Sequence, residues 1–124
     1  MAKSESVFYR YLRDQFKSLS LIRIENSALQ GTPDLLIQNK KGTFFTVELK
    51  VNQIKHKPKF SPHQISFHVQ HPKNSFILIK QKSPVASLYK LYTGDQIMSL
   101  VSCGMKTPPV ACDLPACALI FEKL

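Results

Sequence analysis

Three side chains in this sequence could together cleave a phosphodiester: those of Asp34, Glu48 and Lys50. Two carboxylates can hold Mg²⁺ through hard oxygen ligands, with a strand carbonyl such as that of Leu49 as a third ligand. A metal held there polarises a phosphoryl oxygen and lowers the pKa of a bound water. An ammonium group nearby orients that water or stabilises the developing charge. The pattern Pro33-Asp34, then Glu48-x-Lys50, therefore predicts a hydrolytic metal site.

Two predicted strands, residues 34–38 and 43–51, would position these groups on either side of a turn at residues 39–42. Side chains alternate between the faces of a strand, so Glu48 and Lys50 share one face. The alternate residues form an apolar face for the core: Phe45, Val47, Leu49 and Val51. If the strands pair across the turn, Asp34 lies near Glu48. The alternative is an ordinary Glu–Lys pair on a half-exposed face, with Asp34 as a turn residue after proline.

The remaining pattern predicts helices and strands in alternation. We expect a helix over 4–18 with Ser4 as N-cap, a strand over 21–25, a polar connection over 26–33 and a basic loop over 52–60. A second helix, from Ser61 to Gln70, has Pro62 at its first position and Gln64 completing a capping box. A strand over 75–80 and short helices over 84–92 and 95–103 follow, and the tail from Lys106 is unassigned. The order αβββαβ predicts an α/β domain with helices packed over a mixed sheet.

The charge is concentrated in one half of the chain. The sequence has 124 residues and a net charge of +9. Between Asp34 and Asp95 there are ten Lys and one acid, Glu48, so this segment alone accounts for +9. Such a surface favours binding of nucleic-acid phosphates, although a basic face kept for solubility would look the same. A metal and the surrounding lysines would explain the single acid, Glu48.

Other classes of protein fit poorly. No apolar run approaches the ~18–20 residues of a membrane span, and the N-terminus has no signal-type segment. Three cysteines, Cys103, Cys112 and Cys117, fit neither a disulfide framework nor a common zinc pattern. We expect a protein of the cytoplasm.

Three segments resemble the PD-(D/E)XK nuclease superfamily. They are Gly31-Thr32-Pro33-Asp34-Leu35-Leu36-Ile37, Val47-Glu48-Leu49-Lys50, and Ser61-Pro62-His63-Gln64 followed by Phe67-His68. Within the superfamily the sequence is most similar to small stand-alone VRR-NUC domains, as found in bacteriophages. If a phage encodes the protein, we expect it in the host cytoplasm. The resemblance covers about residues 4–82. We therefore expect a nuclease core over 1–82, with 83–124 as an extension of the same domain and a candidate dimerisation element.

The resemblance implies a restriction-endonuclease-like fold and Mg²⁺-dependent cleavage of DNA, with Mn²⁺ as a substitute. Asp34 and Glu48 would be metal ligands and Lys50 the catalytic lysine. Stand-alone members resemble Holliday junction resolvases and act as homodimers. Because a four-way junction needs two symmetric nicks, a two-fold dimer suits that substrate.

Two further residues match the family at the site. Glu5 matches a glutamate that supports the metal, although an acid in the first helical turn is also favoured by the helix dipole. Gln64 matches a glutamine beside the active site, and its capping-box role is the alternative. Three histidines, His63, His68 and His71, are weaker candidates. One of them could contact DNA phosphate or transfer a proton, and the alternative is a histidine on the helix surface or in the core.

The predicted nucleic-acid contacts are Lys55, Lys57, Lys59, His63 and Lys73. Other functions remain open: a flap, single-strand or non-selective DNA nuclease, a non-catalytic basic DNA-binding module, or a protein that acts on RNA.

Overall fold

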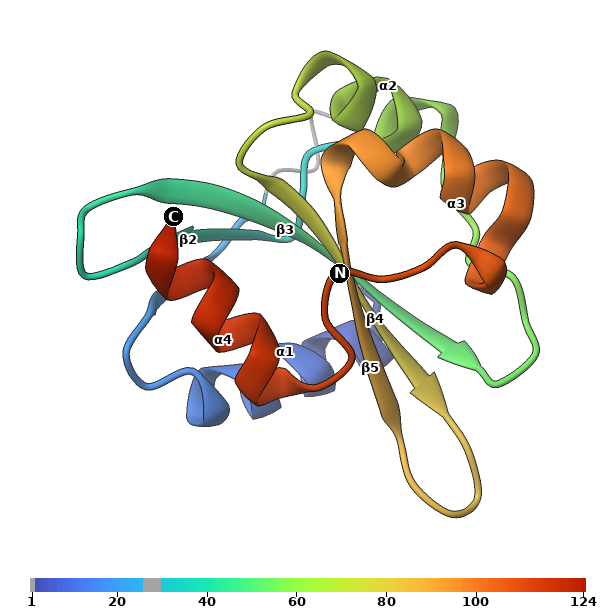
Figure 1. Ribbon diagram of the computed structural model, residues 1–124, viewed down its shortest axis with the longest axis horizontal. Helices are drawn as coiled ribbons and strands as arrows, with labels where there is room; N and C mark the ends of the chain where they lie inside the picture. The colour runs from blue at the N-terminus through green and yellow to red at the C-terminus, as the bar shows by residue number, and fades with distance from the viewer. Residues whose placement is uncertain (1, 26–29) are drawn as a thin grey trace.

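Five strands form one mixed sheet in the computed structural model, which describes residues 2–25 and 30–124 (Figure 1). They are β1 (Ser20–Arg23), β2 (Leu35–Gln38), β3 (Phe44–Gln53), β4 (Ser75–Lys82) and β5 (Leu88–Thr93). The strands are adjacent in chain order, and only the β3–β4 pair is parallel. A parallel pair needs a crossover connection, and the helix between β3 and β4 provides it.

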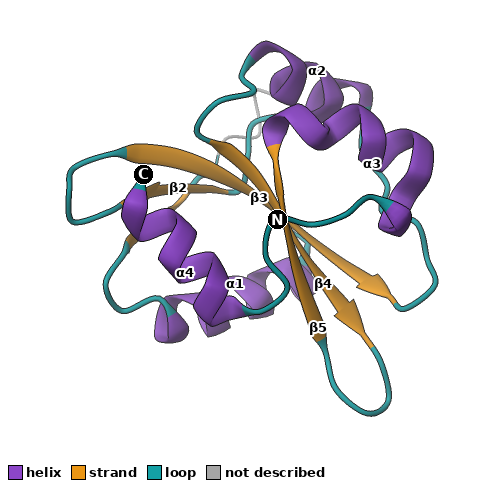
Figure 2. Cartoon of the chain, viewed as in Figure 1, coloured by secondary structure: helices purple, strands orange, loops and turns teal. Residues whose placement is uncertain are grey.

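Helices cover both faces of the sheet (Figure 2). One face packs against α1 (Lys3–Gln15) and α4 (Leu114–Lys123), and the other against α2 (Pro62–Gln70) and α3 (Ile97–Cys103). Single 3₁₀ turns flank α3: η1 (Gly94–Gln96) and η2 (Gly104–Lys106). The arrangement is an α/β domain of αβββαβ order, followed by β5 and the helices α3 and α4. This confirms the fold class predicted from the sequence.

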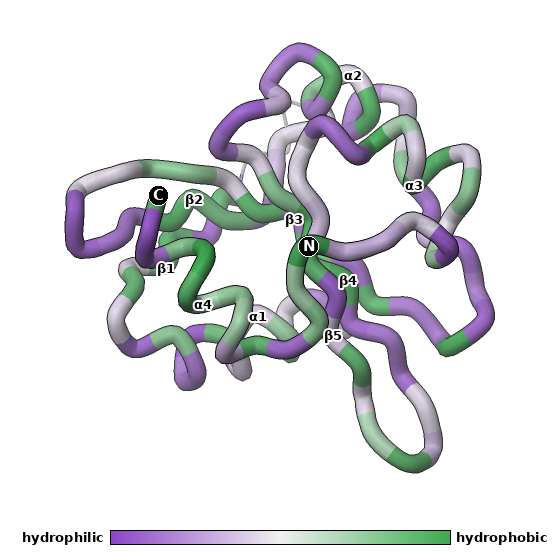
Figure 3. Tube along the Cα trace, in the orientation of Figure 1, coloured by the Kyte–Doolittle hydropathy of each residue, from purple (hydrophilic) through white to green (hydrophobic). Residues whose placement is uncertain are grey.

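The larger core lies under α1 and α4. The apolar face of β3 is buried there with side chains from both helices: Phe45, Val47, Leu49, Phe8, Leu12, Cys117 and Phe121. In Figure 3, α4 and the central strands are mostly hydrophobic, as this packing requires. Burial of a Leu or Phe side chain contributes about 1.5–3 kcal/mol, so this layer holds β3 in place.

A smaller core lies on the opposite face, between the sheet and α3. It contains Ile77, Ile79, Tyr92, Ile97 and Leu100. The β3–β4 register pairs Glu48 with Ile77 and Lys50 with Ile79, so both polar side chains share this second face. The predicted alternation along β3 is therefore confirmed.

The turn between β2 and β3 is also tied to the C-terminal helix. Asn39 Oδ1 accepts hydrogen bonds from the backbone N–H groups of Lys41 and Thr43, both at 3.0 Å. Its Nδ2 donates to the carbonyl of Phe121 at 2.9 Å. One buried side chain thus fixes the predicted hairpin and joins it to α4.

Some local predictions were wrong. Residues 84–92, predicted as a helix, form the turn 83–87 and most of β5. Leu88, Leu91 and Tyr92 have helical spacing, but hydrogen bonding to β4 decides the structure. Ser4 is not the N-cap of α1, because the helix begins at Lys3 and Ala2 occupies that position. The segment 26–29 of the predicted connection lies outside the described residues.

Within the part of the chain that the structure describes, no helix is long and apolar enough to cross a membrane.

Candidate active site

The central feature of the site is that Asp34 lies opposite Glu48. β2 and β3 pair antiparallel with Leu35 facing Val47, so the next pair outward is Asp34 and Glu48. The Oδ2 atom of Asp34 accepts a hydrogen bond from the backbone N–H of Leu49 at 2.8 Å. The Asp34 side chain therefore takes the place of a strand partner where β2 begins. This confirms that the two carboxylates meet.

The carbonyl of Leu49 points to the edge of β3 at which Asp34 lies. Backbone groups of alternate residues bond to β4, as shown by the N–H of Thr46 to the carbonyl of Asn74 at 3.0 Å. Leu49 belongs to the other set of alternate residues, whose backbone groups point towards β2, and its N–H bonds to Asp34. Since the N–H and C=O of one strand residue point to the same side, its carbonyl faces the Asp34 edge.

Glu48 is buried, with 2% of its surface exposed. Burial first, and then the charge of Asp34, raise the pKa of Glu48 to about 9, against the lowering effect of Lys50. Its Oε1 atom has no hydrogen-bond partner among the described residues. A buried carboxylate is costly unless it is paired, protonated or bound to a metal. This unpartnered oxygen beside a second carboxylate fits a divalent cation.

The number of side-chain ligands is small. Among residues 2–25 and 30–124, no group of three or more His, Cys, Asp or Glu side chains is arranged to hold a metal ion. A cation here would be held by Asp34, Glu48 and the carbonyl of Leu49, with water completing the oxygen shell. Mg²⁺ usually keeps several waters and takes only one or two protein carboxylates, so this donor set suits it.

Lys50 is held in place by α2. Its Nζ atom donates a hydrogen bond to Oε1 of Gln64 at 3.0 Å and lies 5.0 Å from the centre of the Phe60 ring. The same Oε1 accepts the backbone N–H of Ser61 at 3.0 Å, and Ser61 Oγ accepts the N–H of Gln64 at 3.2 Å. Gln64 therefore caps α2 and contacts Lys50 at the same time.

A glycine lets α2 approach the loop that carries Asp34. Gly31 has a φ of +83°, and a Cβ atom there would lie 2.5 Å from the carbonyl oxygen of His63. Only glycine fits this conformation and this contact. Since His63 precedes Gln64, the contact fixes the glutamine relative to Asp34.

Glu5 makes a capping contact and also lies beside the candidate site. Its Oε1 accepts the backbone N–H of Ala2 at 3.3 Å, which is a capping contact at the start of α1. It also lines the cleft that contains Lys50, and its charge contributes to the raised pKa of Glu48. It lies near the carboxylate pair rather than within it.

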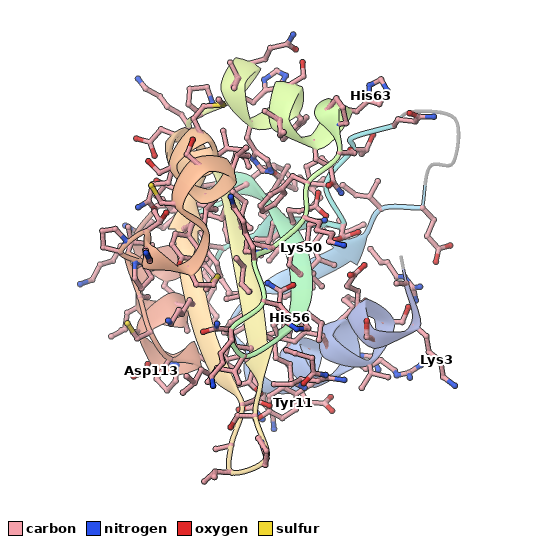
Figure 4. All side chains as sticks on the ribbon, turned by 90° about the vertical axis from the view of Figure 1, so that its right-hand side faces the viewer. Lys3, Tyr11, Lys50, His56, His63 and Asp113 are labelled. Atoms are coloured by element: carbon pink, nitrogen blue, oxygen red, sulfur yellow. The ribbon has the colours of Figure 1, made fainter. Side chains whose placement is uncertain are left out.

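The cleft has a volume of about 800 Å³ and lies between the start of α1 and the loop after β3. In Figure 4, Lys50 lies between the helix that carries Lys3 and the helix that carries His63, with His56 on the loop beside it. Besides Glu5 and Lys50, it is lined by the imidazole of His56 and by four lysines, Lys55, Lys57, Lys59 and Lys82. Three of the five predicted nucleic-acid contacts therefore lie together.

The other two predicted contacts lie apart from the cleft. His63 is exposed on α2, and Lys73 precedes β4, at the opposite end of that strand from Lys82. Lys82 and His56 were not predicted as site residues. The pairing of Gln53 with Lys82 brings Lys82 to the cleft, and a parallel register is not readable from a single sequence.

His68 belongs to the interior. It is fully buried, and its Nδ1 lies 2.6 Å from Oγ of Ser75. Burial and the nearby charge of Lys50 lower the pKa of His68 to about 4, so the ring is neutral at physiological pH. Its contact with Ser75 joins α2 to the sheet. His71 is exposed.

Comparison with solved structures finds a similar protein: Hjc of Archaeoglobus fulgidus, described as a Holliday junction resolvase from an archaeal hyperthermophile. The TM-score is 0.50 and the identity 17%, over 73% of this chain and 78% of that chain. The fold is restriction-endonuclease-like. This confirms the expected fold, and at this identity the likeness concerns the fold alone. No protein-family model and no curated protein matches the chain.

Proposed function

We propose that this restriction-endonuclease-like protein is a metal-dependent DNA endonuclease of the PD-(D/E)XK type, similar to VRR-NUC domains. The observation that carries the proposal is the pairing of half-buried Asp34 with buried Glu48, which has one unpartnered carboxylate oxygen among the described residues. Lys50, on the same face of β3 as Glu48, lines the basic cleft. The proposed substrate is branched DNA, four-way junctions above all, in keeping with the description of Hjc as a Holliday junction resolvase.

In this proposal each residue of the site has a separate role. Asp34, Glu48 and the Leu49 carbonyl would hold Mg²⁺, or Mn²⁺ in its place. When bound, such a cation polarises a phosphoryl oxygen and lowers the pKa of a water ligand. Gln64 fixes the position of the Lys50 ammonium, and Lys50, which lines the cleft, would orient the attacking water or stabilise charge on the phosphate. The lysines of the cleft bind the flanking phosphates.

We further propose that the active form is a homodimer. Two symmetric nicks require two sites, and the described residues form one Asp–Glu–Lys arrangement per chain. A two-fold dimer would relate the two sites. In this proposal 1–82 is the nuclease core and 83–124 its extension. Gel filtration that shows only monomer at micromolar concentration would count against the dimer.

The test is a cleavage assay on a labelled four-way junction beside duplex, flap and single-stranded DNA, with Mg²⁺ or with EDTA. Asp34→Asn and Lys50→Ala are the site variants, and Asp14→Asn and Lys17→Ala are matched controls on the exposed surface of the chain. We expect paired cuts in the junction that EDTA and both site variants abolish and both controls keep. If all substrates were cut equally, the proposed preference for junctions would be wrong and the proposed metal-dependent cleavage would stand.

The second candidate is a non-catalytic DNA-binding module, which the basic cleft alone would also support. It predicts salt-sensitive binding without any Mg²⁺- or Mn²⁺-dependent product. That result in the same assay would replace the nuclease proposal.

A further inference from the structure

The hairpin formed by β4 and β5 extends beyond the body of the molecule and ends in an apolar tip. The turn 83–87 stands alone at the edge of the domain in Figures 1 and 2. Val85, at its apex, is 95% exposed, and Leu88, at the start of β5, is 44% exposed. Figure 3 shows the tip as hydrophobic.

The tip is an ordered turn. The Oγ atom of Ser83 accepts the backbone N–H groups of Val85 and Ala86 at 3.3 and 3.2 Å, and donates to the carbonyl of Ala86 at 2.6 Å. Pro84 has a fixed φ, which restricts the turn further. The backbone is thus arranged to hold the valine side chain outward.

The base of the hairpin is braced against α1. The ring of Tyr89 stacks on that of Tyr11 with centroids 6.2 Å apart, and it lies 5.8 Å from the ring of Phe8. The Nζ atom of Lys80, on the neighbouring strand, lies 5.8 Å from the Phe8 ring. Because its base is packed against α1 and its tip is ordered, the hairpin can bind a partner with little loss of conformational entropy.

The charge around the tip indicates the kind of partner. Lys80 and Lys82 lie on β4, Lys90 lies on β5, and Asp and Glu are absent from both strands and from the turn. Lys82 also lines the cleft that contains Lys50. The tip therefore begins one residue beyond the proposed phosphate-binding surface, and a polyanion in the cleft would reach it.

We propose that the turn 83–87 is a wedge, with Val85 inserted between bases at the branch point of the DNA and Lys80 and Lys82 on the adjoining phosphates. This inference rests on the proposed function, because it names the part of the chain that distinguishes a branched substrate from duplex. Apolar side chains inserted at a base step unstack it at a cost of a few kcal/mol. A branch point already has poorly stacked bases, so the cost is lowest there.

The test measures unstacking directly, in EDTA and therefore without cleavage. A four-way junction and a duplex each carry 2-aminopurine, at the branch point and at a central position respectively. The variant is Val85→Ser, and the matched control is Val69→Ser, at a valine that is 55% exposed on α2. Both positions are exposed, and thermal melts verify that both variants are folded.

We expect the wild-type protein and Val69→Ser to raise the fluorescence of the junction probe and not that of the duplex probe. Val85→Ser should lose this rise and bind the junction about tenfold more weakly, with duplex affinity unchanged. A Val85→Ser variant that behaves like wild type overturns the wedge. So does a change in its oligomeric state on gel filtration, which would make the tip a contact between copies of the chain. The two proposals can fail separately. If the wild-type protein cuts no substrate in the cleavage assay but unstacks the junction, and Val85→Ser loses that unstacking, the wedge proposal stands and the nuclease proposal is wrong.

Discussion

The Nζ atom of Lys50 donates to Oε1 of Gln64 at 3.0 Å, and the same oxygen accepts the backbone N–H of Ser61. One amide therefore joins the start of α2 to the proposed catalytic lysine on β3. Helix capping and the orientation of the lysine are coupled, and variants can separate them.

Replacing Gln64 tests this coupling. Gln64→Ala should lose both hydrogen bonds. We expect the free energy of unfolding to fall by about 1 kcal/mol, and kcat to fall by more than the loss of the helix cap explains. Ser61→Ala removes the hydroxyl cap and keeps the Lys50 contact, so it should lose similar stability with kcat nearly unchanged. Urea melts and single-turnover cleavage rates measure the two effects. Equal kcat values in both variants would show that Gln64 acts only as a cap.

The carboxylate of Glu48 should make the metal-free protein less stable as pH rises. Its pKa is about 9 in the folded protein and near 4.5 in the unfolded chain, so the folded state binds the extra proton between these values. The contribution of the protonated Glu48 carboxyl to stability is fully present below pH 4.5 and is lost as pH rises towards 9. Glu48→Gln should abolish this loss and make the protein more stable than the wild type at pH 8.

Thermal melts in EDTA from pH 5 to pH 9 measure this difference, and Glu122→Gln, at an exposed acid, is the control. Adding Mg²⁺ should restore stability to the wild type and not to Glu48→Gln, because a ligand stabilises only the state that binds it. Identical pH profiles for wild type and Glu48→Gln would contradict the raised pKa.

His68 should act in the opposite direction at acid pH. Burial and Lys50 lower its pKa to about 4, below its ordinary value of 6.5. The unfolded chain therefore takes up the proton first, and stability is lost as pH falls from about 6.5 to 4. His68→Leu should flatten this part of the profile, while His71→Leu, on the exposed end of α2, should leave it unchanged. Denaturant melts at pH 4, 5 and 6.5 compare the three proteins.

Gly31 should tolerate no side chain, for two separable reasons. Alanine there meets both a positive φ of +83° and a Cβ contact of 2.5 Å with the carbonyl of His63. Gly42 has a φ of +86°, but its nearest contact would be Gln38 at 3.9 Å. Gly42→Ala should cost about 1 kcal/mol, the backbone effect alone, and Gly31→Ala about 2 kcal/mol more. Equal losses of stability would mean that α2 can move away.

The sequence was enough to predict the order of elements from α1 to β4, the face of β3 and the meeting of Asp34 with Glu48. Alternation along a strand and a short turn are local properties, and they place these residues without knowledge of distant contacts. The strand β5 was mispredicted because Leu88, Leu91 and Tyr92 satisfy a helical spacing equally well, and pairing with β4 is a non-local choice. Lys82 was missed at the site for a related reason, since the parallel register brings it to the cleft.

The lysines of the cleft give the final prediction, through the salt dependence of DNA binding. Each phosphate that a variant no longer neutralises should reduce the slope of log K against log salt by about 0.9 on duplex DNA. Lys59→Ala should reduce the slope, because Lys59 lines the cleft. Lys73→Ala should not, since Lys73 lies before β4, away from the cleft, although its place in the basic segment predicts a contact. Fluorescence anisotropy from 50 to about 200 mM salt measures both slopes. A reduced slope for Lys73→Ala alone would show that DNA crosses the opposite end of the sheet, and the cleft would then not be the binding surface.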